Sequence, residues 1–214
     1  MYRFVLIAFV ASVSANVILD TQCPKVTPVD NFNFAAYGNG VWYEVARYPH
    51  VAEKKGKCGS AEYKLEGDVI SVKNTYIKNN KLKVIQGTAK LADDAGTTGK
   101  LVHSLPYGGS AMVDSVVNIL AIDYDKFCIA YFCQFDENKK IQFAWVLSRS
   151  KTLSDETKAT IEKFTKDSTL LNASKFVLNG NMTYTHTHTL YINKKLRCWR
   201  LVSGLKVDKI FPLL

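Results

Sequence analysis

The sequence predicts an all-β protein, an eight-stranded antiparallel up-and-down barrel with one C-terminal helix packed on its outside. Two observations predict this fold. From Trp42 onward, short runs rich in Val, Ile, Tyr, Phe and Thr alternate with polar residues, and turn residues interrupt them about every eight to twelve positions. The runs are joined mostly by tight turns, and a meander of this kind loses its exposed edges if it closes on itself. Closure of eight strands leaves an interior able to hold one small ligand.

Clusters of Gly, Asn and Asp mark the ends of the strands. The connection from Pro49 to Lys57 is the long exception among the tight turns, and we expect it to form a lid at one end of the barrel. The expected strands cover residues 41–48, 58–65, 69–78, 81–90, 100–107, 113–122, 126–135 and 141–149.

A helix is expected after the last strand. Ser154 is a typical N-cap residue, and Asp155 and Glu156 place two acids in the first turn, where the helix dipole favours them. Ile161 and Phe164 then recur at a helical interval. This pattern predicts a helix over about 155–166 that packs on the barrel through its apolar stripe, followed by a short strand near 175–178.

The first 15 residues have the features of a secretory signal peptide. Arg3 precedes an apolar run, and the small residues Ser14 and Ala15 end it. The run is about half as long as a membrane-spanning helix. We therefore expect a soluble, extracellular protein with no integral membrane segment. Glycosylation sequons that begin at Asn172 and Asn181 agree with secretion.

The composition is that of a globular protein and excludes disorder, collagen and coiled coil, with 214 residues, 47% hydrophobic and 22% charged. Most of the net charge of +9 lies outside the expected domain, because Arg3 leaves with the signal peptide and residues 181–214 carry +5. Residues 16–180, the expected domain, keep only +3. A nucleic-acid partner is therefore not expected, and 181–214 is expected to be a divergent, poorly ordered basic tail.

Five cysteines remain after the signal peptide, so at least one is unpaired or bonded to another chain. No CxxC pair occurs among them, and no His lies near the closest two, so no metal site is predicted. The five are Cys23, Cys58, Cys128, Cys133 and Cys198.

Three motifs, in order along the chain, resemble the signatures of the lipocalins. Gly40 and Trp42 form a GxW at the start of the first strand, Asp123 lies in the turn before the seventh strand, and Arg149 follows the eighth. The resemblance is greatest to the insect bilin-binding, insecticyanin-like lipocalins and covers about residues 20–178. We expect Trp42 to plug the closed end, with Arg149 across its indole in a cation–π contact of about 1 to 2 kcal/mol. The further matching runs include Cys23-Pro24-Lys25-Val26, Lys57-Cys58-Gly59, Gly87-Thr88-Ala89 and Tyr107-Gly108-Gly109.

The resemblance implies a disulfide between Cys23 and Cys133. It closes a loop of about 110 residues and contributes on the order of 4 kcal/mol in the chain-entropy model. In the bilin-binding lipocalins, the cysteine that matches Cys58 pairs with one shortly after the strand near residue 175. Here the next cysteine is Cys198, so Cys58 either pairs with Cys198 or stays free.

Strand alternation and the resemblance together predict the lining of the barrel. If Cys133 bonds outward, Phe132 and Gln134 face inward, with Ala130 and Cys128 deeper along the same face. The expected ligand-binding residues are Asn74, Tyr76, Ile85, Leu105, Tyr107, Met112, Phe132, Gln134, Ile141, Phe143 and Trp145. Most of them are apolar or aromatic, and a few bring polar groups that a bound ligand can satisfy.

We therefore expect a secreted carrier that binds a small hydrophobic ligand reversibly. The resemblance implies a linear tetrapyrrole such as biliverdin as the bound ligand, for pigmentation or transport, and the lysines Lys54, Lys55 and Lys57 of the lid can face its propionates. Tyr76 stands where the resemblance leads us to expect His. A general carrier of fatty acids, hormones or odorants is therefore the alternative, and the sequence leaves the oligomeric state open.

A cavity enzyme is the remote alternative. It would use Cys128 as an inward free thiol, or His50 or His103 as a base. No Ser/His/Asp order and no paired carboxylates accompany these residues, and His103 is expected to be a hydrogen-bonded structural residue of its strand. We expect no enzymatic activity.

Overall fold

The computed structural model describes residues 22–49, 56–106, 111–136 and 139–179. Within them, one nine-stranded antiparallel sheet closes into a barrel. Its strands are β1 (Gly40–Arg47), β2 (Lys57–Glu66), β3 (Val69–Lys78), β4 (Lys81–Leu91), β5 (Lys100–Leu105), β6 (Val113–Asp123), β7 (Phe127–Asp136), β8 (Lys139–Ser148) and β9 (Val177–Leu178). The helices are α1 (Phe34–Tyr37), α2 (Asp155–Asp167) and the 3-10 turn η1 (Ala173–Lys175).

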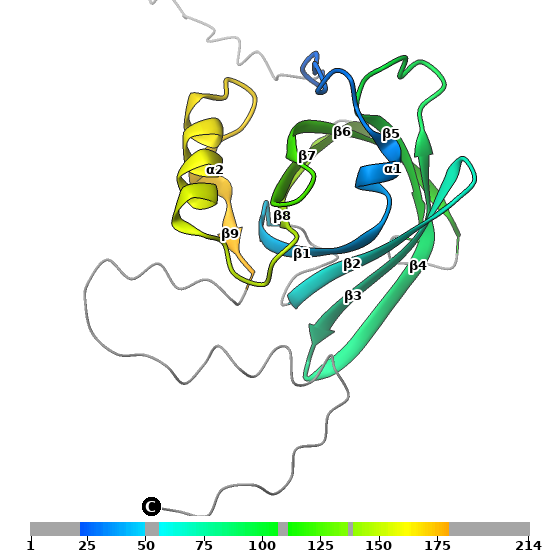
Figure 1. Cartoon of the computed structure of the whole chain (residues 1–214), viewed down its shortest axis with the longest axis horizontal. Coiled ribbons are helices and arrows are strands. Elements are labelled where there is room, and N and C mark those ends of the chain that lie inside the picture. Colours follow the sequence, from blue (N-terminus) through cyan, green and yellow to red (C-terminus); the bar gives the residue numbers. More distant parts are fainter. Residues whose placement is uncertain (1–21, 50–55, 107–110, 137–138, 180–214) are drawn as a thin grey trace, which may run out of the picture.

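Closure of the barrel depends on β1, which is paired on both sides. Residues 40–43 pair with β2 and residues 43–47 with β8, while the end of β1 also pairs with β9. From β2 to β8, neighbours in the chain are neighbours in the sheet. The strands form a ring with α2 on its outside (Figure 1). The predicted eight-stranded up-and-down barrel with one outer helix is thereby confirmed.

The strand limits agree with the predicted ones to within two residues, and α2 ends one residue later than expected. The single turn α1 was not predicted; it begins at the N-cap Asn33, whose side chain accepts from the amide of Ala36. The expected signal peptide, most of the expected lid and the expected basic tail lie outside the described residues.

The closed end of the barrel is filled by Trp42, which is fully buried. Its indole nitrogen donates to the carbonyl of Tyr37 at the end of α1, at 3.1 Å. The guanidinium carbon of Arg149 lies 3.6 Å from the centroid of the indole, a close cation–π geometry. The same guanidinium donates to the carbonyls of Ala36 (2.8 Å) and Tyr124 (2.9 Å). One cation therefore joins β1, α1 and the turn between β6 and β7.

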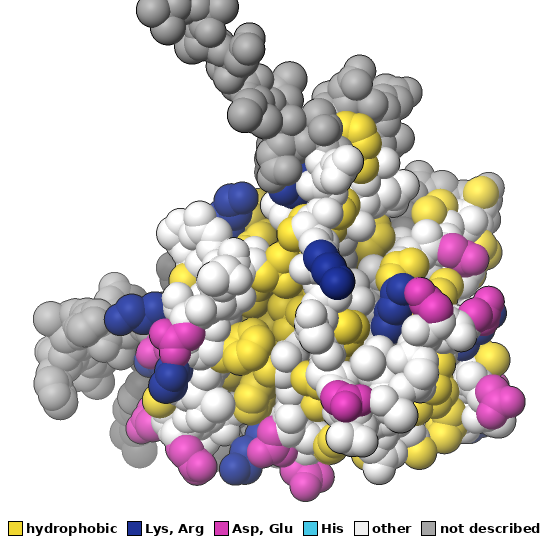
Figure 2. Space-filling view, turned by 90° about the horizontal axis from the view of Figure 1, so that it is seen from above, with side chains coloured by type: hydrophobic (Ala, Val, Ile, Leu, Met, Phe, Trp, Pro, Cys, Tyr) yellow, Lys and Arg dark blue, Asp and Glu magenta, His cyan; other side chains and the backbone are white. Residues whose placement is uncertain are grey.

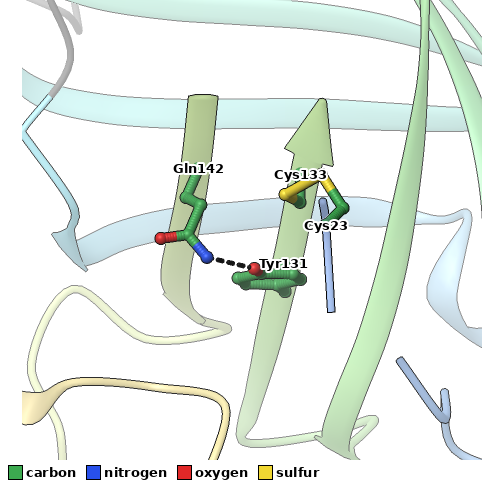
Figure 3. Close-up of a disulfide and its surroundings, with 4 residues drawn as sticks. All are labelled: Cys23, Tyr131, Cys133 and Gln142. Carbon is green, nitrogen blue, oxygen red and sulfur yellow. Dashed lines mark hydrogen bonds between the residues drawn. A yellow bond between two sulfur atoms is a disulfide. The ribbon is translucent and has the colours of Figure 1, made fainter. Parts of the chain in front are cut away.

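A disulfide between Cys23 and Cys133 ties the N-terminal segment to β7, as predicted. Tyr131 and Cys133 lie on the same face of β7, and the amide of Gln142 on β8 donates to the Tyr131 hydroxyl at 2.7 Å (Figure 3). This face points away from the barrel interior. Because side chains alternate along a strand, Phe132 and Gln134 point into the barrel.

The outer face of β7 and β8 is covered by α2. Ser154 caps the helix by accepting from the amide of Thr157 at 3.2 Å, and Ile161 is buried in the cluster beneath it. The strand residues of this cluster include Ile129, Tyr131, Ala144 and Val146. No helix in the described part of the chain is both long and apolar enough to cross a membrane.

The disulfide predicts a large loss of stability when it is removed. Replacing Cys23 and Cys133 together with Ala should lower the free energy of unfolding by about 4 to 5 kcal/mol, because the bond closes a loop of 110 residues in the unfolded chain. Urea unfolding measures the change. The exposed Lys25 supplies the control, since Lys25→Ala should change the value by less than about 0.5 kcal/mol. A double variant as stable as its parent contradicts the prediction.

Candidate ligand-binding site

The interior of the barrel holds two adjoining cavities that share Val117 and Trp145. The deep cavity reaches the closed end at Trp42 and has a volume of about 100 Å³. The outer cavity has about 150 Å³. The deep cavity is lined by Tyr37, Trp42, Glu44, Arg47, Gly59, Ser60, Ala61, Tyr63, Asn74, Thr75, Tyr76, Ile85, His103, Leu105, Val117, Ala130, Trp145 and Leu147. The outer cavity is lined by Val113, Ser115, Val117, Phe132, Gln134, Ile141, Phe143 and Trp145.

Nine of the eleven residues expected to bind the ligand line one or both cavities. Asn74, Tyr76, Ile85 and Leu105 line the deep cavity, and Phe132, Gln134, Ile141 and Phe143 line the outer one, while Trp145 borders both. Met112 lines neither cavity and is 50% exposed just before β6. Tyr107 lies outside the described residues.

Three aromatic side chains form a continuous wall on β7 and β8. The rings of Phe132 and Phe143 are stacked, with centroids 5.4 Å apart and planes within 12° of each other. The centroids of Phe143 and Trp145 lie 5.7 Å apart, with planes tilted by 39°. Together the three rings give the interior an apolar aromatic wall, which suits a conjugated ligand.

An ion pair from β1 lies at the wall of the deep cavity. Nη1 of Arg47 lies 2.6 Å from Oε1 of Glu44, and both side chains are about nine-tenths buried. Strict alternation would turn Ala46 inward after Glu44, but β1 has an irregular register between Glu44 and Ala46 in its pairing with β8. A bulge of this kind places Arg47 on the same side as Glu44. Asn179, which follows β9, donates to the same carboxylate.

Some buried polar atoms of the cavity lining have no hydrogen-bond partner among the described residues. They include Oδ1 of Asn74 and Nε2 of His103. A polar atom buried without a partner costs about 1 to 3 kcal/mol. The cost is recovered when a bound ligand or water supplies the missing bond. Burial lowers the pKa of His103 to about 4, so its imidazole is neutral at pH 7 and able to donate or accept through Nε2, depending on its tautomer.

Two phenols meet at the bottom of the deep cavity. The hydroxyl of Tyr37 donates to that of Tyr63 at 3.4 Å, and both side chains are buried. Burial raises the pKa of Tyr63 to about 12 and also raises that of Tyr37. Both phenols are therefore neutral hydrogen-bonding groups.

Cys128 carries a free thiol and is fully buried in the cluster around Trp42, without lining either cavity. Burial raises the pKa of this thiol far above neutrality. A thiol in this state is inert, because the nucleophile is the thiolate. His50 and Cys198 lie outside the described residues, so a bond between Cys58 and Cys198 stays a prediction.

The interior polar residues Glu44, Arg47, Tyr37 and Tyr63 were missed by the sequence reasoning, and His103 was assigned a structural role. A signal for His103 was present, because it is two residues from Leu105 and therefore shares its face of β5. Nothing in the sequence marks the bulge that turns Arg47 inward.

A closed antiparallel barrel with an aromatic interior, a tryptophan and arginine at its closed end and a helix on its outside defines the lipocalin class of binding proteins. Residues 39–182 match the lipocalin / cytosolic fatty-acid binding protein family, and the chain belongs to this family.

Its relatives include two insect proteins. The bilin-binding protein of Pieris brassicae is 43% identical over 179 residues, which are 83% of this chain and 93% of that protein. Insecticyanin-B of Manduca sexta is 36% identical, over 82% of this chain and 87% of that protein. The solved structure of insecticyanin from the tobacco hornworm Manduca sexta superposes with a TM-score of 0.68 at 37% identity and covers 74% of this chain and 85% of its own. The barrel is thus that of a lipocalin carrier of small hydrophobic ligands.

The buried imidazole predicts a pH-dependent stability. The folded-state pKa of His103, about 4, lies below its ordinary value of 6.5, so the unfolded chain binds a proton on His103 at pH values where the folded chain does not. The contribution is present above about pH 6.5 and is lost as the pH falls toward 4. Between pH 7 and pH 4.5 it should lower the free energy of unfolding by about 2.5 kcal/mol.

Urea unfolding of the parent and of His103→Phe at these two pH values measures the contribution of His103 to the free energy of unfolding. Both proteins share the same carboxylates. The decrease in the free energy of unfolding between pH 7 and pH 4.5 should therefore differ between the parent and the variant only by the contribution of His103. Equal falls in both proteins would show that His103 titrates normally.

Proposed function

We propose that this lipocalin is a secreted carrier that binds a linear tetrapyrrole such as biliverdin in the joined cavities, by reversible burial and without chemistry. One observation carries the proposal: an aromatic wall faces the same interior as the buried amide oxygen of Asn74 and the buried Nε2 of His103, and neither atom has a hydrogen-bond partner among the described residues. The family membership and the name of the Pieris brassicae relative support it.

The chemistry of a bilin matches the two kinds of lining. Its conjugated plane would lie against Phe132, Phe143 and Trp145, and its pyrrole N–H groups and lactam carbonyls would bond to Asn74 and His103. Pockets that bury drug-sized ligands have about 300 to 1,000 Å³, more than the two cavities hold separately. A bilin would therefore span both cavities and extend through the open end.

The propionates of a bilin require cations at the mouth of the barrel. Arg47 lines the deep cavity at the end of β1, and its Nη2 donates to the carbonyl of Gly56, the residue before β2. We place one propionate near this guanidinium and assign the other to the lysines of the expected lid.

Charge on the surface favours a carrier of small molecules over a nucleic-acid binder. On the face shown in Figure 2, basic and acidic side chains are interspersed and form no basic patch. Several exposed lysines are paired with carboxylates, among them Lys73 with Glu62 and Lys64 with Glu66. Nucleic-acid binding requires a contiguous basic surface.

Secretion is part of the proposal. A disulfide between Cys23 and Cys133 persists in oxidising compartments, and such compartments are extracellular or lie along the secretory route. An enzymatic role for Cys128 is not proposed, because its thiol is buried and protonated. Cys128→Ala should leave ligand binding unchanged.

The second candidate function is a general carrier of fatty acids, hormones or odorants. The outer cavity favours it, because most of its lining is apolar. The two candidates predict different roles for Asn74. A bilin has polar groups that can hydrogen-bond to its side chain, whereas an acyl chain has none.

Titration with biliverdin tests the proposal. The mature chain should give a shifted, saturable visible band at one ligand per protein, and Trp145 fluorescence should be quenched since its indole borders both cavities. Asn74→Leu should weaken binding about tenfold, equivalent to about 1.4 kcal/mol, because it removes a buried hydrogen bond. The matched control is Lys73→Gln at the exposed neighbouring position, which should leave the affinity unchanged.

Absence of a saturable band would contradict the bilin proposal. Displacement of a fluorescent fatty acid by unlabelled fatty acids or a juvenile hormone, with equal affinities for the parent and Asn74→Leu, would then support the general carrier.

A further inference from the structure

We infer that Asn172 is an N-glycosylation site that carries an oligosaccharide on the outer wall of the barrel, away from the ligand cavities. The inference concerns a modification that the carrier function does not require. It rests on the proposed function in one respect, because the chain must enter the secretory route. The sequence Asn172-Ala173-Ser174 is an acceptor sequon, and three features of the structure support its use.

The first feature is accessibility. Asn172, Ala173, Ser174 and Lys175 are all exposed. They lie between α2 and β9, on the outside of the ring of strands (Figure 1). None of them lines either cavity. A bulky, hydrated sugar attached here would extend into solvent without displacing packed side chains.

The second feature is that the fold is anchored here through the backbone of Asn172 and leaves its amide nitrogen available. The backbone N–H of Asn172 donates to the hydroxyl of Tyr48 at 2.6 Å, and its carbonyl accepts from the amide of Lys175 at 3.0 Å. The side-chain nitrogen Nδ2 donates to no described residue. Replacing a hydrogen on Nδ2 with a sugar therefore breaks no contact of the described fold.

The third feature is the local geometry of the sequon. Oδ1 of Asn172 accepts from the backbone amide of Ser174 at 3.0 Å and from its hydroxyl at 2.7 Å. Both bonds lie within three residues, so they can form in the nascent chain before the barrel closes. Two donors on Oδ1 draw electron density onto that oxygen and stabilise the form of the amide that has lost an N–H proton.

The reaction transfers an oligosaccharide from a lipid-linked diphosphate donor. Nδ2 of Asn172 attacks the anomeric carbon of the first sugar, a C–N bond forms, and the bond between that carbon and the phosphate oxygen breaks. The lipid diphosphate leaves with the electron pair of that bond, and Nδ2 gives up one proton. No oxidant or reductant is needed.

The test is secretion of the full chain from insect cells, followed by mass spectrometry before and after treatment with peptide N-glycosidase. We expect a heterogeneous mass above that of the polypeptide, which collapses on treatment and leaves Asp at position 172 in the digested peptide. Asn172→Gln and Ser174→Ala should each abolish the shift at this site. Ser174→Thr should keep it, because threonine retains the hydroxyl.

A second set of variants separates the possible outcomes. Asn181→Gln controls for the other sequon and should leave the glycan at position 172 in place. If the chain is not secreted, a version with residues 1–15 replaced by the leader of a known secreted protein tests the acceptor site independently of the proposed native signal. A secreted chain with unmodified Asn172 in both versions overturns the inference. Asn172→Gln should leave the affinity for biliverdin unchanged, since the residue lies outside the cavities.

Discussion

The pairing of β1 on both of its sides is the constraint on which the rest of the structure depends. Because β1 bonds to β2 along its first half and to β8 along its second, the sheet closes and its interior is separated from solvent. An open sheet of the same strands would have two long edges and no cavity. Trp42 near the start of β1 fills one end of the enclosed space, with Arg149 across its indole. At the other end of β1, Arg47 lines the deep cavity.

The polar groups inside the barrel distinguish a binding site from a packed core. A core of this size would be filled with apolar side chains, since an unpaired buried amide or imidazole destabilises the fold. Here Asn74 and His103 are held with open hydrogen-bonding positions beside an aromatic wall. A ligand that bonds to both groups would recover the free energy that their unpaired burial costs.

Much of this architecture was predictable from the sequence because it follows from short-range patterns. The strands alternate with a period of two, and α2 has an N-cap and an apolar stripe, so both kinds of element were expected within two residues of their limits. The turn α1 was missed because four residues are too few to show a helical period. The ion pair of Glu44 and Arg47 was missed for a different reason: a bulge reverses the alternation in β1, and bulges are set by tertiary pairing. Cys128 continues the inward face of β7 as expected, but the cluster around Trp42 fills the space in front of it.

The central claim is that this barrel carries a linear tetrapyrrole, and native mass spectrometry of the protein isolated from its natural source tests it most directly. The account predicts a noncovalent complex with one ligand per chain, in which the released ligand has the mass and visible absorption of a bilin. A complex that releases a fatty acid or another acyclic lipid at the same stoichiometry, with no tetrapyrrole in any preparation, would contradict it.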